Sequence, residues 1–565
     1  MNKPCPAPAV LAAALLSASF AMAAPPVKEI DLTLLGTYAQ PDPDAAFDKS
    51  AAEISAYDPL SKRLFVTNGA AGTIDILDLS NASNPVLLDQ IDVSGPIGTG
   101  GFVGDGANSV AVSGGIVAAA VQAESVTDPG TVAFYNTDGT LLNVVGVGAL
   151  PDMLTFTPDG KYVLVANEGE PNAGVDPEGS VSVIDLGAGV AGATVRHADF
   201  NDFDSQLDAL RNSGVRLFPD VAVQPGEGEI SVSQDLEPEY IASDRKGNTA
   251  LVTLQEANSV AVLDIQQAKI TGIVALGTKD HNAPGNGLDP SDKDGAIKID
   301  NWPLRGLFMP DAIASYQVRG QTFYVTANEG DDRGSADPAG RGDVIRFKDI
   351  VKVSSFGRSG LNPSAGLADM IASGLQGDAQ LGRLNVSSID GIDADGKLAE
   401  LFSYGARSFS IWDSNGQLVW DSGDALEQLT KKLYPLNFNA SNDTNAFEDR
   451  SDNKGPEPEA ITIAKLWGRT YAFVGLERIG GVAVYDIGNP EAPQYVTYIN
   501  NRDFDASDEE LEGGMGLDLG PESVVIIEQA ESPTGAPLMV VANEVSGTVS
   551  IFNIVKLNGS NKRDK

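Results

Sequence analysis

The sequence predicts an all-β protein, a single β-propeller of about eight four-stranded blades, and its spacing also allows seven. Three observations lead to this fold class. A short alternating strand pattern recurs along the chain, each copy follows two further strand-like segments, and a spare strand near the N-terminus can complete the last blade. The composition agrees, because 61 glycines and 42% hydrophobic residues are typical of an ordered protein that is rich in turns.

The recurring pattern is a small residue, a run of alternating apolar residues and a final Asp or Asn. Its copies span residues 73–78, 131–136, 180–185, 259–264, 408–413, 481–486 and 548–553, and a weaker copy spans residues 343–348. Alternation over five or six residues predicts a half-buried strand, and the terminal Asp or Asn predicts the turn that follows it. Counting the weaker copy, the pattern predicts eight blades.

The remaining strands of each blade surround this pattern. A second strand precedes it, as at residues 63–67, and an innermost strand that often opens with Pro and an acidic residue comes before that. A fourth strand usually follows, as at residues 493–497. The last unit ends near residue 555 without its fourth strand. Residues 28–35 form a spare strand that would complete this blade and close the ring.

The N-terminal residues predict export. A short charged start, an apolar run over residues 9–20 and the small-x-small pattern Ala21-Met22-Ala23 are typical of a signal peptide, so residues 1–23 are expected to be removed. Residues 24–557 then form the propeller domain, and residues 558–565 form a polar tail. The single cysteine, Cys5, lies in the removed segment, which leaves no disulfide in the mature chain. The expected location is periplasmic or secreted.

The charge and the histidine count exclude several functions. The net charge of −40 repels nucleic acid and anionic lipid, so neither is an expected partner. Beyond the signal peptide no apolar run is long enough for membrane insertion. Only His197 and His281 are available for zinc or Ser–His chemistry. The sequence does not indicate an oligomeric state.

Two rings of polar residues are expected at one face, because each innermost strand of a propeller begins where the second strand ends. The innermost strands begin at Glu53, Asn108, Asp152, Glu239, Asp311, Glu459 and Glu522, and the second strands end at Glu124, Glu168, Glu256, Glu329, Glu477 and Glu544. Two carboxylates ~5 Å apart repel by ~3 kcal/mol at an effective dielectric constant near 20.

Such crowding favours a bound cation, and oxygen ligands without His or Cys favour Ca²⁺. The predicted ligands at the channel mouth are Asp152, Glu168, Glu239, Asp311, Glu329, Glu459 and Glu522. The alternative is that these acidic residues only cap turns between blades.

A second candidate calcium site is a loop in which Asp289, Asp292 and Asp294 precede Gly295. Alternate acidic residues followed by Gly resemble the first half of a calcium-binding loop. Residues 390–396 repeat the same spacing. Neither loop has the acidic residue that closes the usual twelve-residue pattern, and the same letters also form ordinary turns.

Basic residues are scarce, so the arginines beside these acidic residues are distinctive. Arg333 and Arg478 are candidate phosphate-binding residues at the rim of the mouth, because the guanidinium group suits bidentate contacts with phosphate. A cation ringed by carboxylates, with arginines at the rim, would suit a phosphate ester. The alternative is simple ion pairing of these arginines between blades.

Four phrases of this sequence, at residues 235–242, 285–295, 327–333 and 450–459, resemble the choice-of-anchor I proteins. That family includes bacterial proteins labelled alkaline phosphatases and animal proteins called mesenchyme-specific cell surface glycoproteins. The resemblance implies an exported propeller and supplies no agreed set of catalytic residues. The C-terminal residues contain no wall-sorting motif and no hydrophobic tail, which favours periplasmic or secreted residence over surface anchoring.

Three classes of function are consistent with these features. The first is a calcium-dependent phosphoesterase that acts on a small phosphate ester at the channel mouth, similar to propeller phytases. The second is a non-catalytic surface or matrix protein that binds a carbohydrate or another protein. The third is another hydrolase or lactonase on the same scaffold. The sequence contains no Gly-x-Ser-x-Gly motif for a serine nucleophile.

Overall fold

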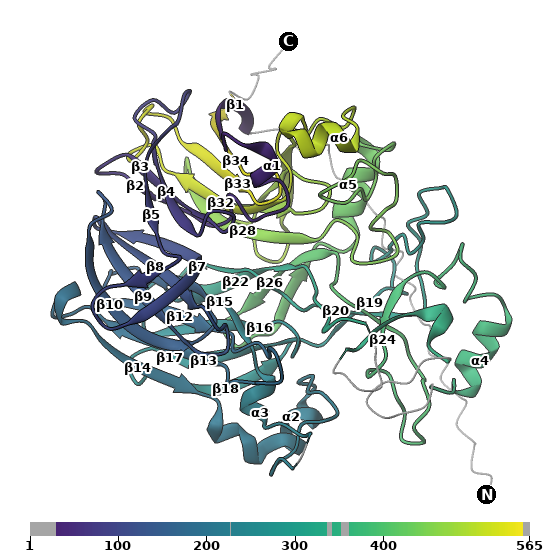
Figure 1. Cartoon of the computed structure of the whole chain (residues 1–565). Coiled ribbons are helices and arrows are strands. Elements are labelled where there is room, and N and C mark those ends of the chain that lie inside the picture. The colour runs from purple at the N-terminus through teal and green to yellow at the C-terminus, as the bar shows by residue number, and fades with distance from the viewer. Residues whose placement is uncertain (1–29, 227, 336–341, 352–360, 558–565) are drawn as a thin grey trace, which may run out of the picture.

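The computed structural model describes residues 30–226, 228–335, 342–351 and 361–557. The predicted signal peptide and the polar tail lie outside these residues. The described part of the chain forms seven antiparallel sheets of the propeller type, which is the lower of the two counts that the sequence allowed. The innermost strands of these sheets contact one another in chain order, and the last contacts the first, so the sheets form a closed ring (Figure 1).

The first four blades are formed by consecutive strands. Blade 1 contains β2 (Ser55–Asp58), β3 (Arg63–Asn68), β4 (Thr73–Asp78) and β5 (Val86–Asp92). Blade 2 contains β7 (Phe102–Ser113), β8 (Ile116–Ala123), β9 (Pro129–Asn136) and β10 (Leu141–Ala149), and β6 (Pro96–Ile97) extends it. Blade 3 contains β11 (Pro151–Phe156), β12 (Tyr162–Asn167), β13 (Ser180–Asp185) and β14 (Thr194–Asp199). Blade 4 contains β15 (Pro238–Ser243), β16 (Thr249–Leu254), β17 (Ser259–Asp264) and β18 (Lys269–Ala275).

The last three blades include one interrupted sheet and one shared between the chain ends. Blade 5 contains β21 (Ile313–Val318), β22 (Gln321–Asn328), β26 (Ser408–Asp413) and β27 (Leu418–Asp421). Blade 6 contains β28 (Pro458–Leu466), β29 (Arg469–Leu476), β30 (Val482–Asp486) and β31 (Gln494–Ile499). Blade 7 contains β32 (Pro521–Ile527), β33 (Leu538–Asn543), β34 (Thr548–Lys556) and, from the other end of the chain, β1 (Ile30–Ala39).

The N-terminal strand closes the ring, as the sequence predicted. β1 pairs antiparallel with β34, so that Thr33 lies opposite Asn553 and Tyr38 opposite Val549. Ile30, Leu32 and Tyr38 of this strand are buried. The apolar core lies mainly between neighbouring blades, where the apolar faces of adjacent sheets meet.

The weaker copy of the repeat at residues 343–348 does not form a blade. Its strand β23 (Val344–Arg346) pairs only with β24 (Asn385–Ser387). The third strand of blade 5 is β26 instead, which pairs with β22 from Phe323 opposite Asp413 to Asn328 opposite Ser408. The prediction of eight blades failed here, because two strands of one sheet are separated by a long insertion.

We call residues 276–308 together with the described part of residues 329–407 the accessory unit. It contains β19 (Thr278–Asp280), β20 (Arg305–Leu307), β25 (Phe402–Ser403), β23 and β24, and it has a buried cluster of its own that includes Trp302, Phe347 and Leu398. Figure 1 shows this unit, with α4 (Ala365–Ala372), at one side of the ring.

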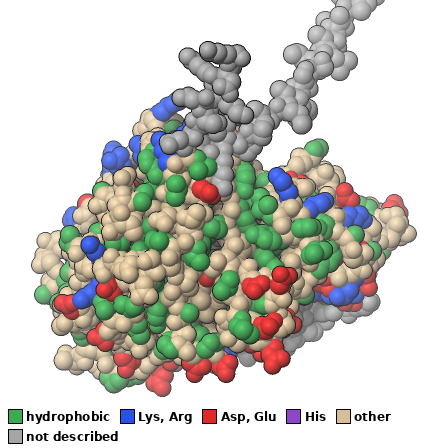
Figure 2. Space-filling model, turned by 90° about the horizontal axis from the view of Figure 1, so that it is seen from above, with side chains coloured by type: hydrophobic (Ala, Val, Ile, Leu, Met, Phe, Trp, Pro, Cys, Tyr) green, Lys and Arg blue, Asp and Glu red, His purple; other side chains and the backbone are tan. Residues whose placement is uncertain are grey.

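The other helices lie in the connections between strands. They are α1 (Pro43–Ala46), α2 (Leu207–Ser213), α3 (Val232–Asp235), α5 (Ala425–Leu433) and α6 (Asp508–Glu510), with short turns at η1 (Val190–Gly192), η2 (Asn201–Gln206), η3 (Phe347–Asp349) and η4 (Leu511–Met515). None of the helices in the described ranges combines the length and the apolar character needed to cross a membrane. On the face shown in Figure 2, acidic side chains are densest along the lower edge of the view.

Candidate cation site at the channel mouth

The acidic residues of the two predicted rings meet at one end of the central channel. The strand register explains this, because Pro151 lies opposite Asn167, Pro238 opposite Leu254 and Pro458 opposite Leu476. The residue that follows each second strand faces the residue before the proline, and Glu168 and Glu477 donate their backbone N–H groups to Leu150 and Glu457. The residue after the proline is therefore its diagonal neighbour at the same end of the sheet. In a propeller the innermost strands surround the axis, so these side chains converge on it.

A cavity of 310 Å³ lies at this position. Its polar lining consists of Glu53, Asn108, Ser109, Asp152, Glu168, Glu170, Glu239, Tyr240, Gln255, Glu256, Asp311, Glu329, Asp331, Glu459 and Glu522. All seven predicted innermost-strand residues are in this set, together with three of the predicted second-strand residues. Glu170 and Asp331 were not predicted as ligands, although each lies two residues beyond a predicted one.

Three of these carboxylates form a tight cluster. One carboxylate oxygen from each of Asp152, Glu168 and Glu239 lies within 4.8 Å of the other two. Burial raises the pKa of Asp152 to about 7. Burial also raises the pKa values of Glu168 and Glu239, and the neighbouring carboxylates add to both shifts. None of the three pairs with a cationic side chain within the described ranges.

Glu256 adds an unpartnered oxygen to the same cavity. Its side chain is buried, and its Oε2 has no hydrogen-bond partner among the residues that the structure describes. Burial raises its pKa, while the charges of Arg333 and Arg216 act in the opposite direction. A buried carboxylate oxygen without a donor is costly, so the cavity is well suited to an added cation.

A second carboxylate cluster is already neutralised by the protein itself. Oxygen atoms of Glu329, Glu457 and Glu477 also lie within 4.8 Å of one another. The ammonium group of Lys454 lies 2.6 Å from Glu329 Oε1 and 3.4 Å from Glu457 Oε2. Lys454 therefore supplies positive charge to this cluster, as a metal ion would.

Glu457 is the centre of this second cluster. Besides Lys454, it pairs with Arg450 at 2.7 Å and with Arg478 at 2.9 Å, and it is fully buried. Burial alone would raise its pKa, but the three cations outweigh burial and lower the pKa to about 2. The carboxyl group is therefore ionised at every physiological pH.

The two candidate phosphate-binding arginines are engaged with carboxylates. Arg478 pairs with Glu477 at 2.9 Å in addition to Glu457. Arg333 pairs with Glu237 at 2.6 Å and lies over the ring of Phe218 at 4.3 Å. The side chain of Arg333 is only 10% exposed, so the prediction that it lies at the exposed rim of the mouth is wrong. Its Nε and Nη1 atoms have no hydrogen-bond partner in the described part of the chain.

A repeated phrase explains part of this arrangement. Glu237-Pro-Glu239 and Glu457-Pro-Glu459 each open an innermost strand. The first Glu of each phrase is buried against arginine, and the second lines the mouth. Only the second Glu of each phrase was predicted as a ligand from the sequence. The repetition of Glu-Pro-Glu was the available signal for the first.

The structure separates the three carboxylates of the predicted calcium loop. Asp289 accepts the backbone N–H of Lys298 at 2.7 Å, and Asp292 pairs with Arg383 at 2.9 Å. Asp294 accepts the backbone N–H of Ala296 at 3.1 Å. Among the described residues, the close groups of three carboxylates do not include these side chains. In the second loop, Asp390 pairs with Arg216 at 2.7 Å.

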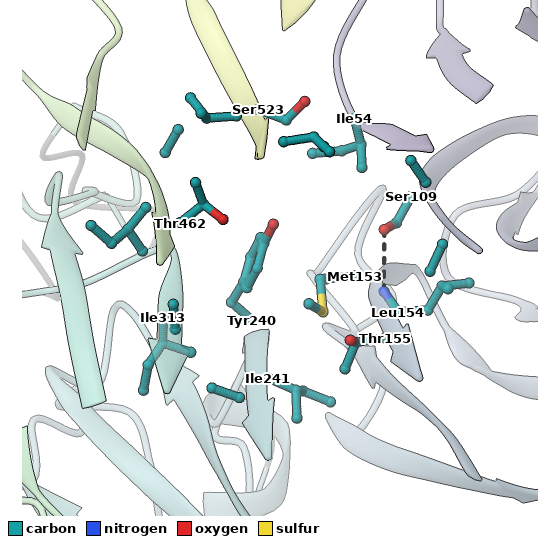
Figure 3. Close-up of a pocket in the computed structure, with 18 of the residues that line it drawn as sticks. Ile54, Ser109, Met153, Leu154, Thr155, Tyr240, Ile241, Ile313, Thr462 and Ser523 are labelled. Atoms are coloured by element: carbon teal, nitrogen blue, oxygen red, sulfur yellow. Dashed lines mark hydrogen bonds between the residues drawn. The ribbon is translucent and has the colours of Figure 1, made fainter. Parts of the chain in front are cut away.

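Below the mouth the channel continues as a second cavity of 430 Å³, which aliphatic and hydroxyl side chains line together (Figure 3). Ile54, Met153 and Tyr240 line both cavities. Figure 3 shows the ring of Tyr240 standing between the surrounding innermost strands. Burial, together with four mouth carboxylates, raises the pKa of Tyr240 above the usual range, so its hydroxyl group stays protonated. Tyr240 forms the floor of the acidic mouth.

The ring of seven sheets and the carboxylate-lined cavity on its axis define a β-propeller with an oxygen-rich central site. Residues 53–490 match the choice-of-anchor I domain. The chain therefore belongs to the choice-of-anchor I family, as the resemblance in its sequence indicated.

Two relatives from animals share part of the chain. Over 189 residues, the chain is 34% identical to Gigasin-3a of Magallana gigas, covering 32% of this chain and 66% of the relative. Over 388 residues, it is 26% identical to the mesenchyme-specific cell surface glycoprotein of Strongylocentrotus purpuratus, covering 63% of this chain and 48% of the relative. The chain thus spans less than two thirds of the length of either relative.

Solved structures with a similar arrangement are distant in sequence. Hydrazine synthase of Kuenenia stuttgartiensis aligns with a TM-score of 0.43 at 13% identity, covering 91% of this chain and 97% of that chain. The β-propeller domain of Myceliophteria thermophila Cps50 (Swd1) aligns with a TM-score of 0.41 at 9% identity, covering 93% and 99%. Neither similarity bears on activity.

Proposed function

We propose that this chain acts outside the cell as a cation-dependent binding propeller, with Ca²⁺ held at the mouth by Asp152, Glu168 and Glu239. The observation that carries the proposal is the tight cluster of these three carboxylates, which has no cationic partner in the described ranges. The unpartnered oxygen of Glu256 in the same cavity supports it. All the donors are oxygen atoms, which Ca²⁺ prefers.

The extracellular part of this proposal rests on the family and on the sequence. A relative is named as a cell surface glycoprotein, and the N-terminal residues have the composition of a signal peptide. A Ca²⁺ ion in an open, polar cavity retains free coordination positions. Through these it would bind hydroxyl or carboxylate groups of a carbohydrate or of another surface protein.

Phosphate ester hydrolysis is the second candidate function. The observation in its favour is Arg333, whose unpartnered Nε and Nη1 atoms lie close enough to Glu256 for its charge to lower the pKa of that carboxyl group. A cation and a guanidinium group on either side of Glu256 would stabilise a phosphoryl group. Arg333 pairs with carboxylates through Nη2 alone, whereas Arg478 pairs through both Nε and Nη1, so Arg478 is a weaker candidate.

The test of the proposed function is calcium binding by the purified chain and by Glu168→Gln. Calcium at a hundredfold excess over its Kd should stabilise the wild type by about 2.7 kcal/mol, because binding relieves repulsion only in the folded state. Glu168→Gln keeps the shape of the side chain, and it should weaken binding at the mouth by about tenfold or more. Glu491→Gln, at an exposed position, is the matched control.

Titration calorimetry measures the calcium affinity of each variant, and melting curves with calcium or chelator measure the stabilisation. Calcium affinities that are equal in the wild type and Glu168→Gln would rule out the mouth as the site. The calcium-loaded chain should then be assayed with a phosphomonoester and a phosphodiester. Release of phosphate that is lost on chelation and on Arg333→Lys supports the second candidate, and background rates reject it.

A further inference from the structure

A second group of buried oxygen atoms lies where the accessory unit meets the propeller. Arg407 holds this junction together. Its Nη1 donates to the carbonyl oxygen of Asp289 at 2.8 Å and to Glu427 Oε1 at 2.7 Å, and its Nη2 donates to the carbonyl oxygen of Ser451 at 2.7 Å. Glu427 Oε2 accepts the backbone N–H of Asp289 at 3.2 Å. None of these residues lines the mouth cavity.

Two acceptor oxygens at this junction lack partners. Asn439 is fully buried, and its Nδ2 donates to Glu427 Oε1 and to Ser451 Oγ, both at 3.0 Å. These bonds fix the orientation of the amide, so the oxygen Oδ1 is the free atom. Glu448 is 1% exposed. Neither Asn439 Oδ1 nor Glu448 Oε1 has a hydrogen-bond partner in the part of the chain that the structure describes.

The charges around these oxygens are predominantly negative. Burial raises the pKa of Glu448 to about 8, and the carboxylates of Asp289, Asp294 and Asp292 act in the same direction. Burial and the neighbouring charge of Glu427 raise the pKa of Asp289 to about 7. The single positive charge of Arg407 does not balance the three buried carboxyl groups of Asp289, Glu427 and Glu448. Buried carboxylates without enough positive charge nearby must be protonated or bind a cation.

We propose that a second divalent cation, Ca²⁺, binds at this junction, with Asn439, Glu448 and Asp289 as its protein ligands. Ca²⁺ takes carboxylate and amide oxygens together, and a carboxylate oxygen that accepts one hydrogen bond still has a free lone pair. Asp292 is not a ligand, because Arg383 engages both of its oxygens. Glu448 supplies the acidic group that the loop at residues 289–295 lacks in sequence.

A water molecule explains the site less well. Water donates at most two hydrogen bonds and leaves the excess negative charge unchanged, whereas a cation satisfies the oxygens and reduces that charge. A proton on Glu448 is the other alternative, because it would donate one hydrogen bond to a neighbouring acceptor. The cation has a consequence that the proton lacks. It links the accessory unit to the segment before blade 6.

The experiment is calcium titration of the full chain, with the number of bound ions measured by calorimetry. We expect two classes of site in the wild type. Glu448→Gln, which keeps the shape of the side chain, should weaken one class by about tenfold or more and leave the other unchanged. Glu168→Gln should affect only the other class, and Glu491→Gln neither. An isotherm of Glu448→Gln identical to that of the wild type overturns the junction site and favours the proton.

Protease resistance provides a second measurement that separates the two sites. In Glu168→Gln, calcium should still slow cleavage of the accessory unit by about tenfold, because the junction site is intact. In Glu448→Gln, calcium should have no such effect. Equal protection of both variants overturns the junction site. If the calcium lost on Glu448→Gln is the only one that the wild type binds, the mouth proposal fails and the junction proposal stands.

Discussion

Glu457 and Glu459 are two residues apart in one short phrase, yet their environments differ. Glu457 is surrounded by Lys454, Arg450 and Arg478, which lower its pKa to about 2. Burial and neighbouring carboxylates raise the pKa of Glu459 well above its usual range. Glu457 has a left-handed backbone φ of 47° just before β28 begins, so it does not share a face with Glu459 as alternate residues of a regular strand would. Identical residues thus have opposite electrostatic environments.

These two positions form a matched pair of substitutions. Glu457→Gln leaves three cations without their common carboxylate, so it should lower the free energy of unfolding by about 3 kcal/mol. Glu459→Gln relieves repulsion, so without calcium it should leave the melting temperature unchanged or raise it. Denaturant unfolding of both variants in chelator measures the difference. Equal destabilisation by the two substitutions would contradict this division of roles.

At the level of elements, the sequence predicted the strands better than their partners. The phrase Ala-Asn-Glu stands at the ends of β12 and β22, as residues 166–168 and 327–329, and in both strands the Asn side chain donates to a serine of the third strand. Asn167 donates to Ser182 at 2.9 Å, and Asn328 donates to Ser410 at 2.7 Å. Residues 343–348 contain no hydroxyl side chain that could accept such a bond. Pairing across a long insertion depends on this distant contact, which alternation along one strand does not reveal.

The site was predictable to a similar degree. Propeller topology places the ends of paired strands at one face, so the two rings followed from the repeat alone. Lys454 was not predicted, because it comes from the loop before blade 6 and has no fixed place in the repeat. Asn439 and Glu448 lie in the same connection. Glu427 links Asn439 to the backbone N–H of Asp289, and this link depends on how the accessory unit packs.

The closing strand β1 makes its own prediction. Removing residues 1–39 exposes the edge of β34 and leaves the contacts of Ile30, Leu32 and Tyr38 unmade. At about 2 kcal/mol for each buried side chain, the loss should reach roughly 6 kcal/mol. Removing residues 558–565 is the control, and it should have little effect. Melting curves compare the two truncations, and equal midpoints would be inconsistent with closure by β1.

For the whole molecule, the dependence of stability on pH follows from two opposite pKa shifts. The pKa of Glu457 is lowered to about 2, so its contribution is present above pH 4.5 and is lost as the pH falls further. Burial raises the pKa values of Asp152 and Glu53 to about 7 and about 8. Protonation of these groups is retained in the folded state, so stability declines as the pH rises from about 4 to 8.

The calcium-free chain should therefore be most stable near pH 5, and calcium should reduce the decline towards pH 8. Melting temperatures at pH 5 and pH 8, each with calcium and with chelator, measure this. The net charge of −40 acts in the same direction, so Glu168→Gln serves as the comparison, and its decline in chelator should be smaller. A chelated wild type that gains stability between pH 5 and pH 8 would refute the assignment.

The pairing of β1 with β34 has a consequence for how the protein is made. β1 leaves the ribosome more than 500 residues before its hydrogen-bonding partner β34. Until β34 has been made, β1 has no partner in the ring, and blade 7 cannot assemble. A product that stops early in blade 7 would leave an open sheet edge and a broken ring, which quality-control proteases recognise. The fold therefore makes synthesis of β34 a condition for burying β1.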